Sequence, residues 1–113
     1  MGKKLILYFV DGYNSLANLT MYGLASELGD IVGPTHCYYD KGWHTISTEH
    51  VVIHVVHRGN CMEALRYDEI FNTNDPIILA RLNNPNKPRF KGSILDYVEQ
   101  VEKEMSQHTG DEK

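Results

Sequence analysis

The stretch Leu5-Ile6-Leu7-Tyr8-Phe9-Val10-Asp11-Gly12 decides the fold of this 113-residue chain. Six consecutive apolar residues ended by Asp-Gly predict a strand that is buried on both faces, as at the centre of a parallel sheet. A helix is expected next, capped by Ser15 or Asn18 and ended near Gly29. Its predicted apolar face consists of Ala17, Met21, Leu24 and Leu28.

The remaining segments continue this alternation of strands and helices. Strands are predicted at 35–39, 51–56 and 77–80, a turn at 40–42, and a helical stretch from Met62 to about Phe71. A last helix begins at a capping box of Ser93 and Asp96. Its predicted apolar face is Ile94, Val98, Val101 and Met105. We therefore expect a single compact α/β domain over residues 1–107, with a mostly parallel central sheet flanked by helices, and a frayed tail over 108–113.

The charge is unevenly distributed along the chain. The net charge of -4 comes entirely from residues 93–113, while residues 1–92 carry equal numbers of acidic and basic side chains. The acidic balance therefore does not exclude a nucleic-acid partner. No apolar stretch approaches the roughly 20 residues that a membrane helix needs, and the first apolar run is too short for a secretory signal. Cys37 and Cys61 show no Cys-x-x-Cys spacing, so we expect a cytoplasmic protein with reduced thiols and no membrane partner.

The motif Val10-Asp11-Gly12-Tyr13-Asn14 resembles the first strand end of NYN domains, a PIN-like nuclease group in which an apolar strand precedes Asp-Gly-Tyr-Asn. Tyr39-Asp40 and Tyr67-Asp68-Glu69-Ile70 resemble the end of the second strand and an acidic helical segment of such proteins. The resemblance implies a ribonuclease that depends on Mg2+ or Mn2+. Its implied site residues are Asp11, Asp40 and Asp68 or Glu69 as metal ligands, with Asn14 in an orienting role. The sequence departs from the family after residues 77–80, where no carboxylate follows until Asp96.

A basic segment offers a candidate contact for RNA. It contains no acidic residue and consists of Arg81, Lys87, Arg89, Phe90 and Lys91. The cations would contact phosphates, and the ring of Phe90 would stack on a base. A solvated loop without a ligand is an equally good interpretation of this segment.

Two other functions remain open at the level of sequence, as does the oligomeric state. A non-catalytic binding or inhibitor protein would engage a protein partner through its loops and its acidic last helix, which carries Glu99 and Glu102. A flavodoxin-like nucleotide or anion binder would use the helix N-terminus that follows Asp11, although this carboxylate would repel an anion.

The histidines do not predict a metal site. Structural zinc is not expected, because no known spacing joins the possible ligands, which are His36, Cys37, His44, His57 and Cys61. His50 and His54 are interpreted as hydrogen-bonded polar groups on one strand face.

Overall fold

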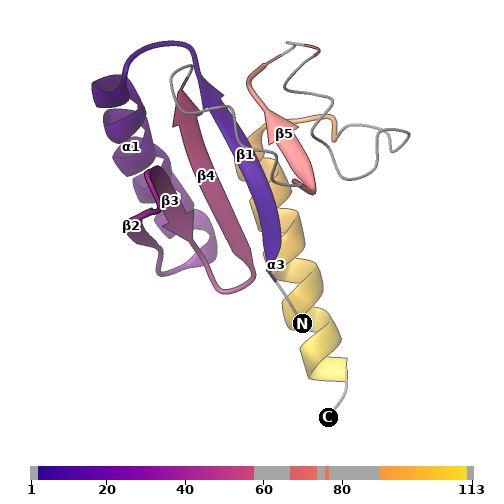
Figure 1. Ribbon diagram of the computed structural model, residues 1–113. Coiled ribbons are helices and arrows are strands. Elements are labelled where there is room, and N and C mark those ends of the chain that lie inside the picture. Colours follow the sequence, from indigo (N-terminus) through magenta and orange to yellow (C-terminus); the bar gives the residue numbers. More distant parts are fainter. Residues whose placement is uncertain (1–2, 58–66, 74–75, 77–89, 112–113) are drawn as a thin grey trace.

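The computed structural model describes residues 3–57, 67–73, 76 and 90–111. Its elements are β1 (Lys4–Val10), α1 (Asn14–Val32), β2 (His36–Asp40), β3 (Trp43–Ser47), β4 (Val51–His57), β5 (Glu69–Phe71) and α3 (Ile94–Asp111). The strands form one sheet in the order β2-β3-β4-β1-β5, with β1 between its two parallel neighbours (Figure 1). The described part of the chain is thus a compact mixed α/β domain.

The sheet is mixed, which corrects the expectation of a mostly parallel sheet. β1 runs parallel to β4 and β5, but β3 is antiparallel to both β2 and β4. The predicted turn at 40–42 does form, with φ of 56° at Lys41 and 93° at Gly42. Because this turn reverses the chain at once, residues 43–47 return as an antiparallel strand, and no helix intervenes.

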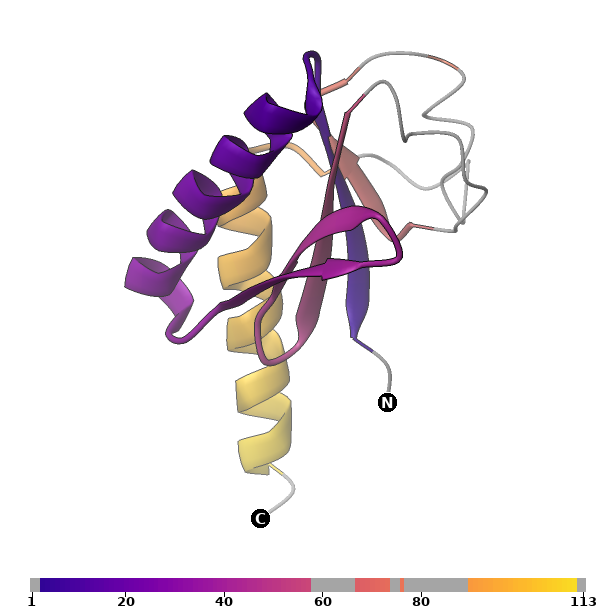
Figure 2. The same cartoon turned by 60° about the vertical axis from the view of Figure 1, so that its left-hand side comes forward.

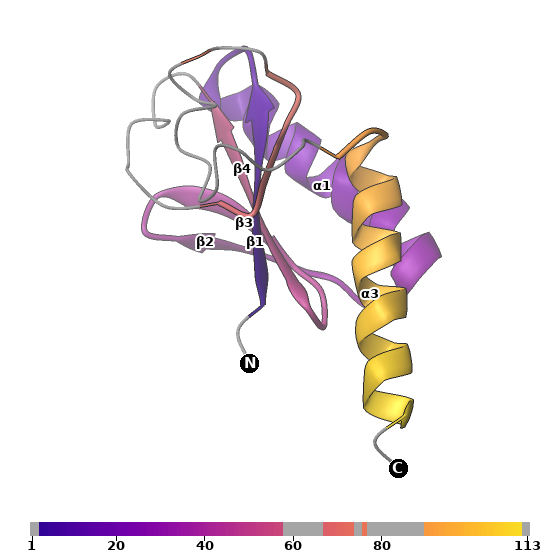
Figure 3. The same ribbon diagram turned by 90° about the vertical axis from the view of Figure 1, so that its right-hand side faces the viewer.

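The two helices α1 and α3 lie on the same face of the sheet (Figures 2 and 3). The predicted apolar face of α1 is confirmed, since Ala17, Met21, Leu24 and Leu28 are all buried. The opposite face of β1 is buried too, in a second cluster that contains Leu7, Phe9, Val56, Tyr67 and Ile70. β1 is therefore covered on both faces, as its unbroken apolar run predicts.

The prediction of a helical stretch from Met62 to about Phe71 is wrong for its last three residues. Residues 69–71 form β5, which pairs with β1 so that Ile6 lies opposite Glu69 and Tyr8 opposite Phe71. Pairing with a distant strand overrides a weak local helical pattern here. Residues 62–66 and the strand predicted at 77–80 lie outside the described residues.

The capping box at the start of α3 is confirmed. The Asp96 amide donates to Ser93 Oγ at 3.2 Å, and the Ser93 amide donates to Asp96 Oδ2 at 3.3 Å. α3 continues to Asp111, into the segment expected as a frayed tail. In the described ranges, no helix has both the length and the apolar character needed to cross a membrane.

Candidate functional site

Asp11 lies where the sequence predicts it, directly after the carboxyl end of β1, and its side chain is exposed. The Gly12 amide donates to the Val10 carbonyl at 3.0 Å, which turns the chain tightly toward α1. A Cβ atom at Gly12 would lie 2.6 Å from Leu16 Cδ2, so this close approach favours glycine. The motif therefore forms a compact strand-to-helix turn that holds Asp11 at the edge of the sheet.

Asn14, the first residue of α1, connects this turn to the β2–β3 hairpin. Its Oδ1 lies 2.9 Å from His44 Nε2 and accepts a hydrogen bond from Tyr39 Oη at 3.3 Å. Tyr39 Oη and His44 Nε2 are 3.0 Å apart as well. These contacts fix the Asn14 amide, so the residue ties α1 to the hairpin.

His44 is the buried member of this group, with only 1% of its surface exposed. Burial, assisted by the nearby His57, lowers the pKa of His44 and favours the neutral ring. Within the described residues its Nδ1 has no hydrogen-bond partner. A neutral, buried imidazole suits a structural contact with Asn14 and Tyr39.

The structure does not bring Asp68 to Asp11. The Leu5 amide donates to Asp68 Oδ2 at 2.8 Å, and the Asp68 amide donates to the Leu5 carbonyl at 2.7 Å. Asp68 therefore lies beside the start of β1, whereas Asp11 follows its end. Asp11 is six residue steps beyond Leu5 along this extended segment, a span of roughly 20 Å.

Glu69 also lies away from Asp11. It is only 3% exposed, and its Oε2 accepts a hydrogen bond from the Phe90 amide at 3.3 Å. Burial first, and then the negative charges of Glu69, Asp68 and Glu104, together raise the pKa of the nearby Tyr97 to about 12. Glu69 thus belongs to the interior between β5 and α3.

Asp40 shares an edge of the sheet with Asp11. β2 runs in the same direction as β1, so its last residue lies at the carboxyl edge, with Trp43 opposite. Three strand spacings separate β2 from β1, a backbone distance of roughly 14 Å. The structure therefore brings Asp11 and Asp40 to one edge without placing their backbones side by side.

Two of the predicted RNA-binding residues, Phe90 and Lys91, fall within the described residues, while Arg81, Lys87 and Arg89 lie outside them. Lys91 is exposed. The ring of Phe90 packs edge-on against Tyr97, with centroids 5.1 Å apart, and contacts Phe71 at 6.3 Å. This half-buried ring thus packs against side chains of β5 and α3.

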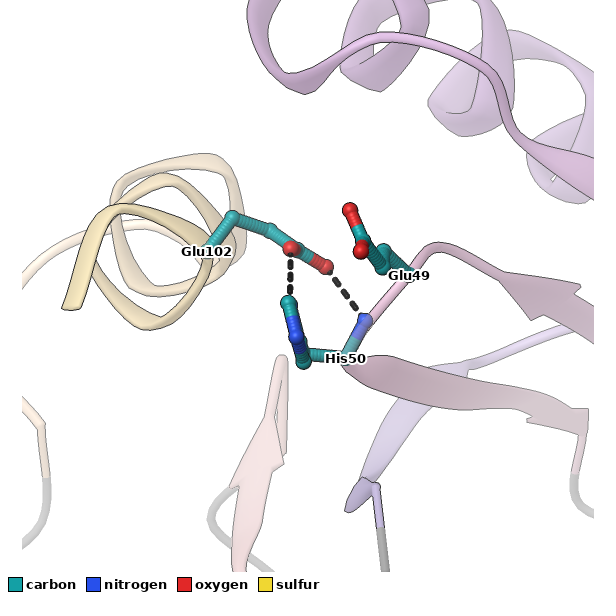
Figure 4. Close-up of side chains that lie close together, drawn as sticks. All are labelled: Glu49, His50 and Glu102. Atoms are coloured by element: carbon teal, nitrogen blue, oxygen red, sulfur yellow. Dashed lines mark hydrogen bonds and ion pairs between the residues drawn. The ribbon is translucent and has the colours of Figure 1, made fainter. Parts of the chain in front are cut away.

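A cluster that the sequence did not predict lies at the other edge of the sheet, at the turn between β3 and β4. It consists of Glu49, His50 and Glu102, and one ligand atom from each lies within 4.8 Å of the others (Figure 4). Glu102 comes from α3, more than 50 residues along the chain. Carboxylate and imidazole groups at these separations are compatible with a divalent cation.

Glu102 is already hydrogen-bonded by three donors. Its Oε2 accepts from the Thr48 hydroxyl and from the His50 amide, the latter at 2.7 Å, and its Oε1 accepts from His50 Nδ1 at 2.7 Å. A cation bound to His50 Nδ1 would have to replace the hydrogen that this atom donates. In this arrangement Thr48, His50 and Glu102 hold α3 against the β3–β4 turn, and we call these three residues the clasp.

The pKa of Glu102 agrees with this assignment. Burial by itself would raise it, but the hydrogen bonds from Thr48 and His50 outweigh burial and leave the pKa below its ordinary value. The sequence signal for this residue was its position, because Glu102 follows Val98 by four residues and so borders the apolar face of α3. The role of Glu102 becomes clear only from its hydrogen bonds with Thr48 and His50, which are distant in sequence.

His50 and His54, which the sequence predicts to be hydrogen-bonded, both have a hydrogen-bond partner. His54 Nδ1 lies 3.0 Å from Tyr67 Oη, and its ring stacks on Trp43 at a centroid distance of 4.9 Å. His50 precedes β4 and bonds Glu102.

Comparison with protein-family models, with curated proteins and with solved structures found no match to this chain.

Proposed function

We propose that this chain is a non-catalytic protein-binding domain that engages its partner through one apolar surface. In the described part of the chain, every large apolar side chain that is exposed belongs to α1, to the residue before it, or to β2. These residues are Tyr13, Leu16, Leu19, Tyr22, Ile31, Tyr38 and Tyr39, and all of them except Tyr38 make up what we call the α1–β2 face. Tyr13 is 84% exposed and Leu19 is 68% exposed, so this surface has no cover within the described chain.

Leu16 and Leu19 lie at the centre of the α1–β2 face. Tyr13, Leu16, Leu19 and Tyr22 follow one another at intervals of three, and because three residues turn the helix by about 300°, Tyr13 and Tyr22 flank the two leucines on opposite sides of α1. Tyr39 bonds Asn14 at the start of α1 and extends this surface onto the edge strand β2, whereas Tyr38 points to the opposite face of the sheet. Apolar patches of about 300–600 Å2 commonly mark sites of interaction.

The α1–β2 face also carries no charged side chain over its central part. No Asp, Glu, Lys or Arg occurs between Asp11 and Glu27, or between His36 and Tyr39. The exposed acidic side chains of the last helix, which include Asp96, Glu99 and Glu104, belong to a different surface, that of α3. An uncharged apolar surface favours a protein partner over a phosphate backbone.

The positions of the carboxylates favour this function over a nuclease. A shared metal centre requires ligands within about 2.0–2.6 Å of one ion. Asp68 lies near the start of β1, and Glu69 is buried against α3, so neither reaches the turn that carries Asp11. In this proposal the resemblance at Val10–Asn14 reflects a degenerate relative of PIN/NYN-like nucleases, which needs no Mg2+ or Mn2+. A cytoplasmic location stays part of the proposal and suits the free thiol of Cys37.

The absence of catalysis is testable with single-stranded RNA and Mn2+. We expect the unmodified chain and Asp11→Asn to leave the RNA equally intact, and circular dichroism would verify that the variant is folded. Metal-dependent cleavage by the unmodified chain that disappears in Asp11→Asn would overturn the proposal in favour of the nuclease.

The binding surface is testable by site-specific photo-crosslinking in the cells from which the chain originates. A photoreactive residue replaces Leu19 on the α1–β2 face or, as the matched control, Glu99 on the exposed face of α3. We expect adducts of defined mass from position 19 only. Adducts from position 99 alone would move the interface to the acidic helix, and a lack of adducts at both positions would contradict a protein-binding function.

A further inference from the structure

We propose that the cluster of Glu49, His50 and Glu102 is a binding site for Zn2+, in which His50 Nε2 and the Glu49 carboxylate are the ligands and Glu102 orients the His50 ring. The site lies at the turn between β3 and β4, at the opposite edge of the sheet from Asp11. It shares no residue with the α1–β2 face, so it does not rest on the proposed function.

The hydrogen bond between His50 and Glu102 leaves the second ring nitrogen of His50 available. A carboxylate only accepts, so Nδ1 carries the hydrogen that it donates to Glu102 Oε1 at 2.7 Å. In the neutral ring Nε2 then carries a lone pair, and among the described residues it has no hydrogen-bond partner. The side chain of His50 is 24% exposed, so the ring can be reached from solvent.

Glu102 holds His50 in the state that a metal ligand needs. A histidine that binds a metal through one ring nitrogen usually donates the other N–H to a carboxylate, which fixes the tautomer and makes the ligand more basic. Glu102 is 8% exposed, and its Oε2 is held by the Thr48 hydroxyl and the His50 amide. The orienting carboxylate is therefore itself fixed by the fold.

Glu49 supplies the second ligand. One of its carboxylate oxygens lies within 4.8 Å of a ring nitrogen of His50 and of a carboxylate oxygen of Glu102 (Figure 4). Glu49 is exposed and makes no hydrogen bond or ion pair within the described part of the chain, so its side chain can turn toward a cation without breaking either. Water would complete the coordination, as it does in open zinc sites.

The charges of the cluster favour a cation. Among the described residues, the only ion pair that either carboxylate makes is the one between Glu102 and His50. Lys3, which contacts the same turn, donates instead to Ser47 Oγ at 2.8 Å and to the Thr48 carbonyl at 2.9 Å. A buried carboxylate without a permanently charged partner is stabilised by a cation nearby.

The types of ligand select the metal. An imidazole nitrogen together with a carboxylate oxygen suits Zn2+, whereas Mg2+ and Ca2+ prefer sites made only of oxygen atoms. We therefore expect Mg2+ not to compete with Zn2+ at this site.

Isothermal titration calorimetry of the metal-free full chain with ZnCl2 tests the ligands. We expect Zn2+ binding that Glu49→Gln and His50→Gln each weaken by at least about tenfold. Glu99→Gln and His36→Gln change the same residue types at exposed positions elsewhere, and each should alter the affinity by less than about twofold. Circular dichroism would verify folding, and Glu49→Gln, which removes no hydrogen bond described here, keeps the test valid if His50→Gln fails to fold.

Nitrogen NMR of the His50 ring, at about pH 8, distinguishes a ligand from a structural histidine. In the metal-free chain we expect the spectrum of a ring that carries its hydrogen on Nδ1. Added Zn2+ should shift the Nε2 resonance while Nδ1 keeps its hydrogen. Glu102→Gln should weaken Zn2+ binding by about 10–100-fold, the usual effect of losing the carboxylate that orients a ligand.

Three results would overturn this inference. They are an Nε2 resonance that saturating Zn2+ leaves unchanged, an affinity that Glu49→Gln leaves intact, and loss of the Nδ1 hydrogen on binding, which would make Glu102 a direct ligand. None of them would alter the adducts expected from position 19, so the proposed function is tested separately.

Discussion

A single carboxylate, that of Glu102, joins the last helix of this molecule to the turn between β3 and β4. It accepts hydrogen bonds from Thr48 and from the amide and ring of His50, and it is 8% exposed. The sequence placed Glu102 on an acidic surface with Glu99. The structure separates the two, because Glu102 faces the β3–β4 turn and Glu99 faces solvent.

Removing the charge of Glu102 should destabilise the fold. Glu102→Gln weakens three hydrogen bonds to a buried acceptor and leaves the His50 donor poorly matched. We expect a loss of about 1–3 kcal/mol in the free energy of unfolding, measured by urea denaturation. Glu99→Gln, one turn earlier on the exposed face, should change it by less than about 0.5 kcal/mol. Equal losses in the two variants would contradict the clasp.

The contribution of Glu102 should depend on pH in a defined direction. Because its pKa in the folded protein lies below the ordinary value of 4.5, the folded state favours the ionised form. The stabilisation is therefore complete above about pH 4.5 and is lost as the pH falls through the lowered pKa. Urea titrations of the unmodified chain and of Glu102→Gln should differ clearly at about pH 5.5 and converge as the buffer is made more acidic than about pH 4.5. A difference that grows below about pH 4.5 would contradict the assignment.

At the scale of elements, patterns of neighbouring residues in the sequence predicted those parts of the fold that depend on interactions within one segment. β1, the apolar face of α1, the turn after β2 and the capping box of α3 all follow from adjacent residues. β3 was missed because His44, Thr45 and Ser47 are polar, and their burial depends on partners elsewhere in the fold. β5 was assigned to a helix because its three residues become a strand only by pairing with β1.

The start of α3 offers a test at this scale. Ser93→Ala removes the acceptor of the Asp96 amide and should lower the free energy of unfolding by about 1 kcal/mol. Ser106→Ala, at an exposed position inside the same helix, is the matched control and should be neutral or slightly stabilising. Thermal unfolding followed by circular dichroism measures both, and an equal decrease in Tm would rule out a capping role.

At the scale of the whole molecule, charge and apolar surface lie on different helices. The exposed acidic residues of α3 include Asp96 and Glu99, whereas the central α1–β2 face has no charged residue. The sequence revealed the acidic segment, because charge can be counted along a chain. It did not reveal the α1–β2 face, because exposure depends on which face of α1 the sheet covers.

This separation predicts how binding at the α1–β2 face responds to salt. An interface without charges is not screened, so the yield of photo-crosslinked adducts from position 19 should change by less than about threefold between about 0.05 and 0.5 M NaCl. An interface made by the acidic face of α3 would instead respond strongly to ionic strength. Photo-crosslinking in lysates adjusted to the two salt concentrations distinguishes the surfaces.

The central position of β1 also has a consequence for the newly made chain. β1 leaves the ribosome well before its neighbours β4 and β5, which begin only at Val51 and Glu69. The most apolar segment of the protein therefore emerges without either strand that will cover its edges. Until β4 has been synthesised, the run Leu5–Val10 has the properties of an unpaired, aggregation-prone strand.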